Sequence, residues 1–122
     1  MMYMSENEIE EVFKKLRVKE FTFKVGSERV IAHADVFLVE VGSRGKTNIK
    51  ELAEALKYPK ELVEEVIRFL KDLGLVKYCG ELSEETTIEL TDIGLELKNR
   101  IEKEREESLE SLSSALESGL FG

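Results

Sequence analysis

The sequence predicts a mainly α-helical fold that carries one small β-hairpin. Three observations predict it: apolar repeats at helical spacing separated by glycines, a glycine-ended helix over residues 59–73 followed by two short alternating runs, and a long polar helix near the C-terminus. The chain has 122 residues, of which 42% are hydrophobic and 36% are charged. This length and hydrophobic share suffice for one packed domain with an accessory helix.

The first 45 residues are predicted to hold two helices. Ser5 can cap a helix that runs to Leu16, because Glu8 takes the second position of a capping box. Residues 18–25 alternate apolar and polar side chains as a strand does, but they could also extend a helix. Over residues 28–41 the apolar side chains recur with the period of a helix, which predicts a second helix despite their β-branched character.

Two further helices are predicted between residues 47 and 74. Thr47 or Asn48 opens the first of these helices. Pro59 suits the first position of the second, because a backbone N–H at that position would have no partner within the helix and proline has none. Gly74 then supplies a left-handed cap that ends the second helix.

Two short strands, residues 75–78 and 86–90, are predicted to surround an acidic loop, and Thr91 caps the last helix. That helix runs for roughly two dozen residues, or about 35–40 Å, so it overhangs a domain of this size. Its outer leucines need a surface to pack on, and a second copy of the chain can provide one. The residues expected to form this dimer contact are Leu97, Ile101, Leu109, Leu112 and Leu116.

The segments IKELAEALKYPKELVEEVIRFLKDLGLV and IELTDIGLEL resemble the core of archaeal and bacterial MarR-like transcriptional regulators. The most specific pieces are the ELAEAL helix, the GLV that enters the wing, and the LT-x-x-G that starts the next helix. The resemblance implies a winged helix-turn-helix fold with an N-terminal helix and a long C-terminal dimerisation helix. The expected division is an N-terminal helix and connector over residues 1–27, a winged-helix core over 28–94 and the C-terminal helix over 95–122.

The same resemblance implies a homodimer that binds double-stranded DNA to control transcription. The helix over residues 59–73 would enter the major groove, and the hairpin over residues 76–90 would touch the DNA backbone. Matched residue by residue, the residues that would face the bases are Lys60, Glu61, Glu64, Glu65 and Arg68. Of these, Lys60, Glu64 and Arg68 are the expected contacts with DNA. The residues implied to support the DNA backbone are Arg44, Lys46 and Lys50.

The charge of the chain departs from that pattern and supports an alternative function. The net charge is −8 and no segment is net basic, so the strong positive charge of a high-affinity nucleic-acid-binding surface is missing. Glutamates occupy both the reading helix and the wing; they are Glu61, Glu64, Glu65, Glu81, Glu84 and Glu85. The alternative is therefore a protein-interaction module that binds a basic partner through its acidic helix face.

Signatures of catalysis and metal binding are missing from the sequence. It has no nucleophile elbow, phosphate loop or histidine-bearing triad, so no enzymatic activity is expected. His33 and Cys79 are single and have no metal-site spacing, so no metal or other cofactor is expected. Cys79 is interpreted as a small apolar strand residue, with a thiol redox sensor as the alternative.

Composition also predicts where the protein acts. The apolar runs are too short to span a bilayer and the N-terminus lacks a secretory signal, so the chain is expected to be cytoplasmic. Glu and Lys dominate while Gln and Trp are absent, which is typical of proteins from hyperthermophiles and favours an archaeal source.

Overall fold

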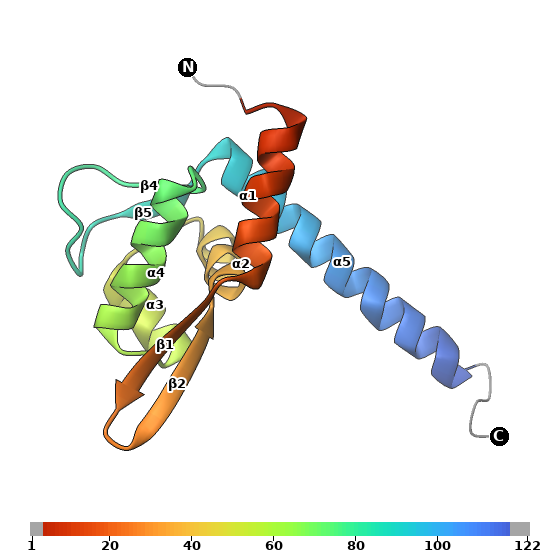
Figure 1. Ribbon diagram of the computed structural model, residues 1–122, viewed down its shortest axis with the longest axis horizontal. Helices are drawn as coiled ribbons and strands as arrows, with labels where there is room; N and C mark the ends of the chain where they lie inside the picture. The colour runs from red at the N-terminus through yellow and green to blue at the C-terminus, as the bar shows by residue number, and fades with distance from the viewer. Residues whose placement is uncertain (1–3, 118–122) are drawn as a thin grey trace.

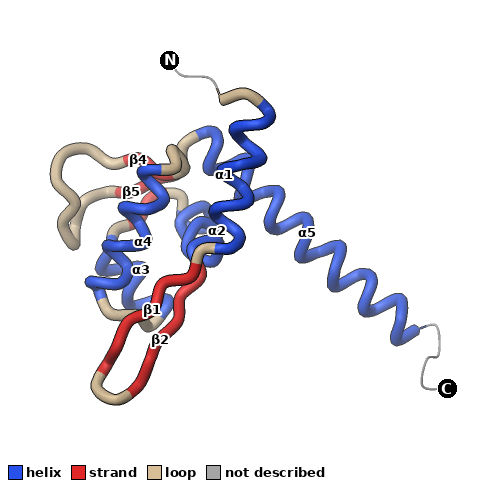
Figure 2. Tube along the Cα trace, in the orientation of Figure 1, coloured by secondary structure: helices blue, strands red, loops and turns tan. Residues whose placement is uncertain are grey.

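The computed structural model describes residues 4–117, and the side chains of this part up to residue 108. Its elements in chain order are α1 (Glu6–Val18), β1 (Glu20–Val25), β2 (Glu28–His33), α2 (Ala34–Arg44), β3 (Lys46–Thr47), α3 (Ile49–Leu56), α4 (Lys60–Asp72), β4 (Val76–Lys77), β5 (Ile88–Leu90) and α5 (Asp92–Glu117). Figures 1 and 2 show a long α5 that runs outward from a body built by the other elements. The predicted mainly α-helical winged fold is confirmed.

Helix α2 lies at the centre of the hydrophobic core. Its side chains Phe37, Leu38 and Val41 have no exposed surface, and the helix packs against α1, α4 and α5. Full burial of one such side chain stabilises the fold by about 1.5–3 kcal/mol. The core therefore fixes the position of α4, which carries the candidate functional face.

Two of the predicted helix starts are confirmed by their hydrogen bonds. The Glu8 N–H donates to Ser5 Oγ at 3.2 Å, which caps α1. The Glu51 N–H donates to Asn48 Oδ1 at 2.8 Å, so Asn48 rather than Thr47 is the cap of α3. Pro59 is the residue before α4 rather than its first residue, one position from the prediction.

Residues 20–33 form a β-hairpin, so the prediction of a helix over residues 28–41 is wrong for its first part. Strand β2 pairs antiparallel with β1, and the helix begins only at Ala34. A two-residue turn at Gly26 joins the strands, with Gly26 at a φ of 65°. The β-branched residues of β2 suit a strand, and β2 supplies the backbone partner for β1. If residues 28–33 were helical, β1 would have no strand to pair with.

The wing belongs to a three-stranded sheet of order β3-β5-β4. Thr47 pairs with Ile88 on one side of β5, and Val76 pairs with Leu90 on the other. Strand β3 ties the start of α3 to the wing. The sheet therefore holds the helix-turn-helix and the wing in one rigid arrangement.

The junction between α4 and α5 explains the LT-x-x-G motif. Gly74 takes a φ of 79°, and the Leu75 N–H donates to the Leu70 carbonyl oxygen at 2.9 Å, which closes the end of α4. The Thr91 hydroxyl donates to the Gly74 carbonyl oxygen at 2.6 Å and accepts the Gly94 N–H at 3.1 Å. A Cβ atom on Gly94 would collide with the Leu75 carbonyl group. Threonine and glycine thus let α5 start directly against the turn after α4.

The expectation that Leu97 and Ile101 form a dimer contact is wrong. Both side chains are completely buried within one chain, where they anchor the base of α5 to the core. They have no surface to offer a second copy. The side chains of Leu109, Leu112 and Leu116 lie outside the described residues, although the helix itself continues to Glu117.

Candidate nucleic-acid interface

Helix α4 has one face in the core and one face in solvent. The buried face consists of Leu62, Val63, Val66, Ile67 and Leu70. The opposite face exposes Lys60, Glu61, Glu65 and Arg68, with Glu64 half-buried. The 3.6-residue period of the helix separates these two sets, so the polar face is available to a partner.

The wing loop is fastened to the start of α4 and of α3. The Lys60 Nζ atom lies 3.0 Å from Glu84 Oε1, and the Lys50 N–H donates to the Glu84 carbonyl oxygen at 3.2 Å. Two lysines that were predicted to contact DNA therefore meet at Glu84, Lys60 through its side chain and Lys50 through its backbone N–H.

The wing loop has an internal scaffold of hydrogen bonds. The Ser83 N–H donates to Thr86 Oγ1 at 2.9 Å, and the Thr86 hydroxyl donates to the Glu81 carbonyl oxygen at 3.0 Å. These bonds fold the loop into a compact turn, which points Glu84 at Lys60 and leaves Glu85 exposed. Cys79 is exposed in a bend at the entrance of the loop and lies outside β4, so its interpretation as a strand residue is wrong.

Glu64 and Arg68 form an ion pair along the exposed face of α4. Arg68 Nη2 donates to Glu64 Oε1 at 2.7 Å, and this hydrogen bond raises the pKa of Arg68 above its ordinary value. Because both side chains are exposed, solvent screens the pair and its net contribution is small. Glu61 and Glu65, by contrast, form no ion pair among the described side chains.

The other predicted backbone contacts lie around β3. Arg44, the last residue of α2, places its Nε atom 2.9 Å from Glu40 Oε1 and its Nη1 atom 3.8 Å from Glu51 Oε2. Lys46 lies opposite Glu89 in the backbone register of β3 and β5, and Glu89 Oε1 lies 3.2 Å from Lys77 Nζ. Most cations of the predicted site are thus matched by carboxylates of the chain itself.

The β1–β2 hairpin adds cations that the sequence analysis did not include in the site. Lys24 and Arg29 lie directly opposite each other near its tip. The sequence signal was present: two alternating runs are separated by the two residues Gly26 and Ser27, which is typical of a hairpin turn. The helical period of the longer segment 28–41 obscured it.

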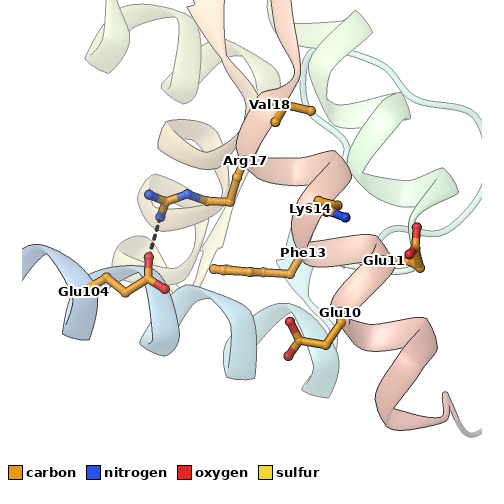
Figure 3. A pocket seen from close by; sticks show the side chains of 7 residues that line it. All are labelled: Glu10, Glu11, Phe13, Lys14, Arg17, Val18 and Glu104. Carbon is orange, nitrogen blue, oxygen red and sulfur yellow. Dashed lines mark ion pairs between the residues drawn. The ribbon is translucent and has the colours of Figure 1, made fainter.

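An open pocket of about 390 Å³ lies between α1 and α5, where Phe13 forms part of the lining (Figure 3). Arg17 Nη1 lies 3.2 Å from Glu104 Oε2 across it, and Arg100 Nη1 lies 2.7 Å from Glu10 Oε1. The hydrogen bond from Arg100 lowers the pKa of Glu10 below its ordinary value. These charges are paired with one another, and they link α1 to the base of α5.

The described part of the chain offers neither a metal centre nor a membrane span. Within residues 4–117, no three His, Cys, Asp or Glu side chains gather into a set able to hold a metal ion. No helix there combines the length and the apolar character needed to cross a bilayer.

Solved structures with the same fold are winged-helix transcriptional regulators. The chain is similar to a MarR family regulator from Neisseria meningitidis, with 21% identity, a TM-score of 0.56, and coverage of 73% of this chain and 61% of that one. It is similar to a MarR family regulator from Listeria monocytogenes in complex with a 26mer DNA, with 20% identity, a TM-score of 0.54, and coverage of 73% and 57%. A transcriptional regulator homologue from Pyrococcus horikoshii OT3 matches with 25% identity, a TM-score of 0.50, and coverage of 64% and 77%.

These likenesses confirm the MarR-like winged-helix fold that the sequence predicted. The chain spans less than two thirds of the length of the Neisseria and Listeria proteins, at 61% and 57%. No protein-family model matches the chain, and no curated protein is similar to it in sequence.

Proposed function

We propose that this chain is a DNA-binding transcriptional regulator that acts as a homodimer, with α4 in the major groove. One observation carries the proposal: the polar face of α4 is left uncovered beside the wing, in a fold that a Listeria monocytogenes regulator shares in its complex with DNA. An α-helix fits the width of the major groove, where base edges can be distinguished. No catalytic role is part of the proposal.

Binding would require the site to exchange its internal ion pairs for contacts with DNA. Lys60 would leave Glu84 and Arg68 would leave Glu64, each to meet a phosphate or a guanine edge. The exchange is feasible because exposed ion pairs are worth only about 0–1 kcal/mol each. Once released, Glu64 can accept a hydrogen bond from the cytosine amino group.

The supporting contacts come from the region around β3. Lys50 stands at the start of α3 with an exposed side chain, and Lys46 is exposed in the adjacent strand. Together with Arg44, these residues would meet phosphates beside the groove. Such contacts position a protein on DNA without specifying a sequence.

The outer part of α5 would form the dimer contact. Helix α5 has 26 residues and leaves the body of the chain, as Figure 1 shows. Leu109, Leu112 and Leu116 recur at helical spacing in this outer part. A two-fold dimer would present two copies of α4 to half-sites about one helical turn of DNA apart.

The composition of the chain fits a hyperthermophilic archaeon, whose genome lies in the cytoplasm. The 36% share of charged residues exceeds the usual quarter, and ion-pair networks of the kind seen between α1 and α5 are favoured at high temperature. We therefore place the proposed regulator in the cytoplasm of such an organism.

Selection of duplexes from a random-sequence pool tests the proposal. Repeated capture on the immobilised protein is expected to enrich a sequence with two-fold symmetry, because a two-fold dimer meets equivalent half-sites. A pool that stays random after many rounds would contradict a sequence-reading regulator.

A protein-interaction module is the second candidate, because Glu61 and Glu65 are exposed on α4. Among the described side chains neither carboxylate has an ion-pair partner, so both remain available to a basic protein. Affinity capture with the chain and with a variant carrying Glu61→Gln, Glu64→Gln and Glu65→Gln tests this. An unchanged set of captured proteins would rule out this face as the docking surface.

A further inference from the structure

The wing and the β1–β2 hairpin lie at opposite edges of the exposed face of α4. The wing loop reaches α4 through Glu84 and Lys60, whereas the hairpin reaches it through Phe21, whose ring packs edge-on against Phe69 at 5.5 Å. Lys60 and Phe69 are nine residues apart, which is about two and a half turns of helix. Their side chains therefore leave α4 on opposite sides, with the exposed face between them.

The hairpin extends toward the start of α4. Its root contacts Phe69 in the C-terminal half of the helix, through Phe21. At the next residue pair toward the tip, the Ile31 carbonyl oxygen accepts a hydrogen bond from the Tyr58 hydroxyl at 3.2 Å, just before α4 begins. The tip continues in that direction, and Figure 1 shows it projecting past the turn that joins α3 to α4. In helix-turn-helix proteins this N-terminal end of the reading helix approaches the bases.

Two cations lie across from each other close to this tip. Lys24 and Arg29 are directly opposed in the antiparallel register, about 7 Å beyond the pair that contains Ile31 at 3.4 Å per residue. Like charges in this position destabilise a hairpin. Glu28, the nearest acidic neighbour, lies on the other face of the strand because successive side chains alternate.

This cation pair differs from three of the five basic residues assigned to the candidate site, whereas Lys46 and Lys50, like the pair, have no carboxylate partner among the described side chains. Lys60, Arg68 and Arg44 each lie within 4 Å of a carboxylate, at 3.0, 2.7 and 2.9 Å. Neither Lys24 nor Arg29 has such a partner among the described side chains, although the chain has a net charge of −8. An unfavourable arrangement that the fold keeps at an exposed tip indicates a partner with negative charge.

We propose that the β1–β2 hairpin is a second wing, which contacts the DNA backbone through Lys24 and Arg29. The inference rests on the proposed function and adds a contact surface to it. A helix about 10–12 Å wide fills a major groove about 12 Å wide, so elements on its two sides meet the two phosphate strands that border the groove. The wing would contact the phosphate strand on one side of the groove, and the hairpin would contact the phosphate strand on the other side.

A pair of charge-matched variants tests the second wing. One carries Lys24→Ala with Arg29→Ala, and the other carries Lys14→Ala with Lys15→Ala on the exposed side of α1. Both lose the same charge, so only location distinguishes them. Binding to a labelled duplex is measured over a salt series. Loss of two phosphate contacts per chain should reduce the magnitude of the slope of log K against log salt by about two per chain, or about four for a dimer, and should lower the affinity by about tenfold or more. The α1 variant should keep the slope of the unaltered protein.

A single substitution separates function from folding. Lys24→Glu places opposite charges across the hairpin, so it should raise the thermal midpoint of unfolding while it weakens DNA binding. A merely structural role for Lys24 would move both quantities in the same direction.

The outcomes distinguish this inference from the proposed function. If the unaltered protein binds DNA and both double variants retain its affinity and slope, the second wing is overturned and the regulator stands. If the unaltered protein binds no duplex, both are overturned. Loss of a protein partner by the Lys24 and Arg29 variant, with DNA binding intact, would reassign the hairpin to protein recognition and likewise overturn the second wing.

Discussion

Lys60, the first residue of α4, is bound to Glu84 of the wing loop, with 3.0 Å between Nζ and Oε1. The two residues lie in different elements, and the backbone of Glu84 is itself held by the Lys50 N–H at 3.2 Å. The loop thus places a carboxylate next to a cation of α4. In the proposed regulator, that carboxylate competes with a DNA phosphate.

Glu84→Gln is therefore expected to strengthen DNA binding. Both partners of the pair are exposed, so its loss should raise affinity by about two- to fivefold, which corresponds to about 0.4–1 kcal/mol. Glu85→Gln is the matched control, because it removes the same charge from the same turn but contacts no described cation. Fluorescence anisotropy with one labelled duplex compares them, and equal gains would show that the ion pair has no role.

Charge reversal on α4 is expected to abolish binding. Lys60→Glu with Arg68→Glu removes two cations from the face that would enter the groove and adds two repulsive charges. The affinity should fall well over tenfold, with a salt slope lower by about two per chain. Circular dichroism should be unchanged because both side chains are exposed. Full affinity in this variant would refute the assignment of α4.

The ion pair between Glu10 and Arg100 is expected to make the stability of the α1–α5 contact depend on pH. The pKa of Glu10 is lowered by the hydrogen bond from Arg100, so the pair stabilises the folded state above the ordinary carboxyl value of 4.5. That contribution is lost as the pH falls through the lowered pKa. Urea unfolding should find Glu10→Gln less stable than the unaltered chain at neutral pH and equal to it in stronger acid. Glu11→Gln should be as stable as the unaltered chain at both pH values. A stability difference between Glu10→Gln and the unaltered chain that persists in acid would exclude this mechanism.

Gly94 is expected to tolerate no side chain. A Cβ atom would meet the Leu75 carbonyl group, so Gly94→Ala should lower the free energy of unfolding by about 1–3 kcal/mol. Thr91→Ala removes the cap of α5 and should cost about 1–2 kcal/mol. Asn99→Ala on the exposed side of α5 is the control. The thermal midpoints of unfolding of the three variants are compared. Equal midpoints would show that Thr91 and Gly94 do not stabilise the junction between α4 and α5.

Truncation after Glu107 is expected to yield a monomer. The outer part of α5 carries the three leucines proposed as the dimer contact, whereas Leu97 and Ile101 stay buried in the remaining core. The core should therefore remain folded while the molar mass halves, as measured by light scattering. A truncated chain that remains dimeric would move the interface to another surface.

The sequence predicted those elements whose signals are local. Ser5 and Asn48 predict the N-terminal caps of α1 and α3, because a short polar side chain can accept a hydrogen bond from a nearby backbone N–H. Gly74 marks the end of α4 because glycine adopts the left-handed conformation without a Cβ penalty. The ends of these helices could therefore be predicted from capping and turn residues, whereas the winged-helix arrangement was implied by the resemblance to MarR-like regulators.

The remaining features depend on contacts between distant residues. Strand β2 was mistaken for helix because Val30 and Ile31 fit both periods, and only pairing with β1 selects the strand. Leu97 faces the core instead of a second chain because of where α5 crosses α2. The pair Lys60 and Glu84 arises from the folded loop, and no spacing rule predicts it. The fold could thus be predicted from the sequence, whereas the ion pairs of the candidate site could not.

Binding of the purified protein to a labelled random-sequence duplex over a salt series is the measurement that decides whether this chain binds DNA. We expect micromolar affinity at low salt that falls steeply as salt rises, because cations of α4 and its flanking elements would release counterions from the phosphates. The absence of any binding at the lowest salt would contradict it, and would leave the acidic face of α4 as a surface for a protein.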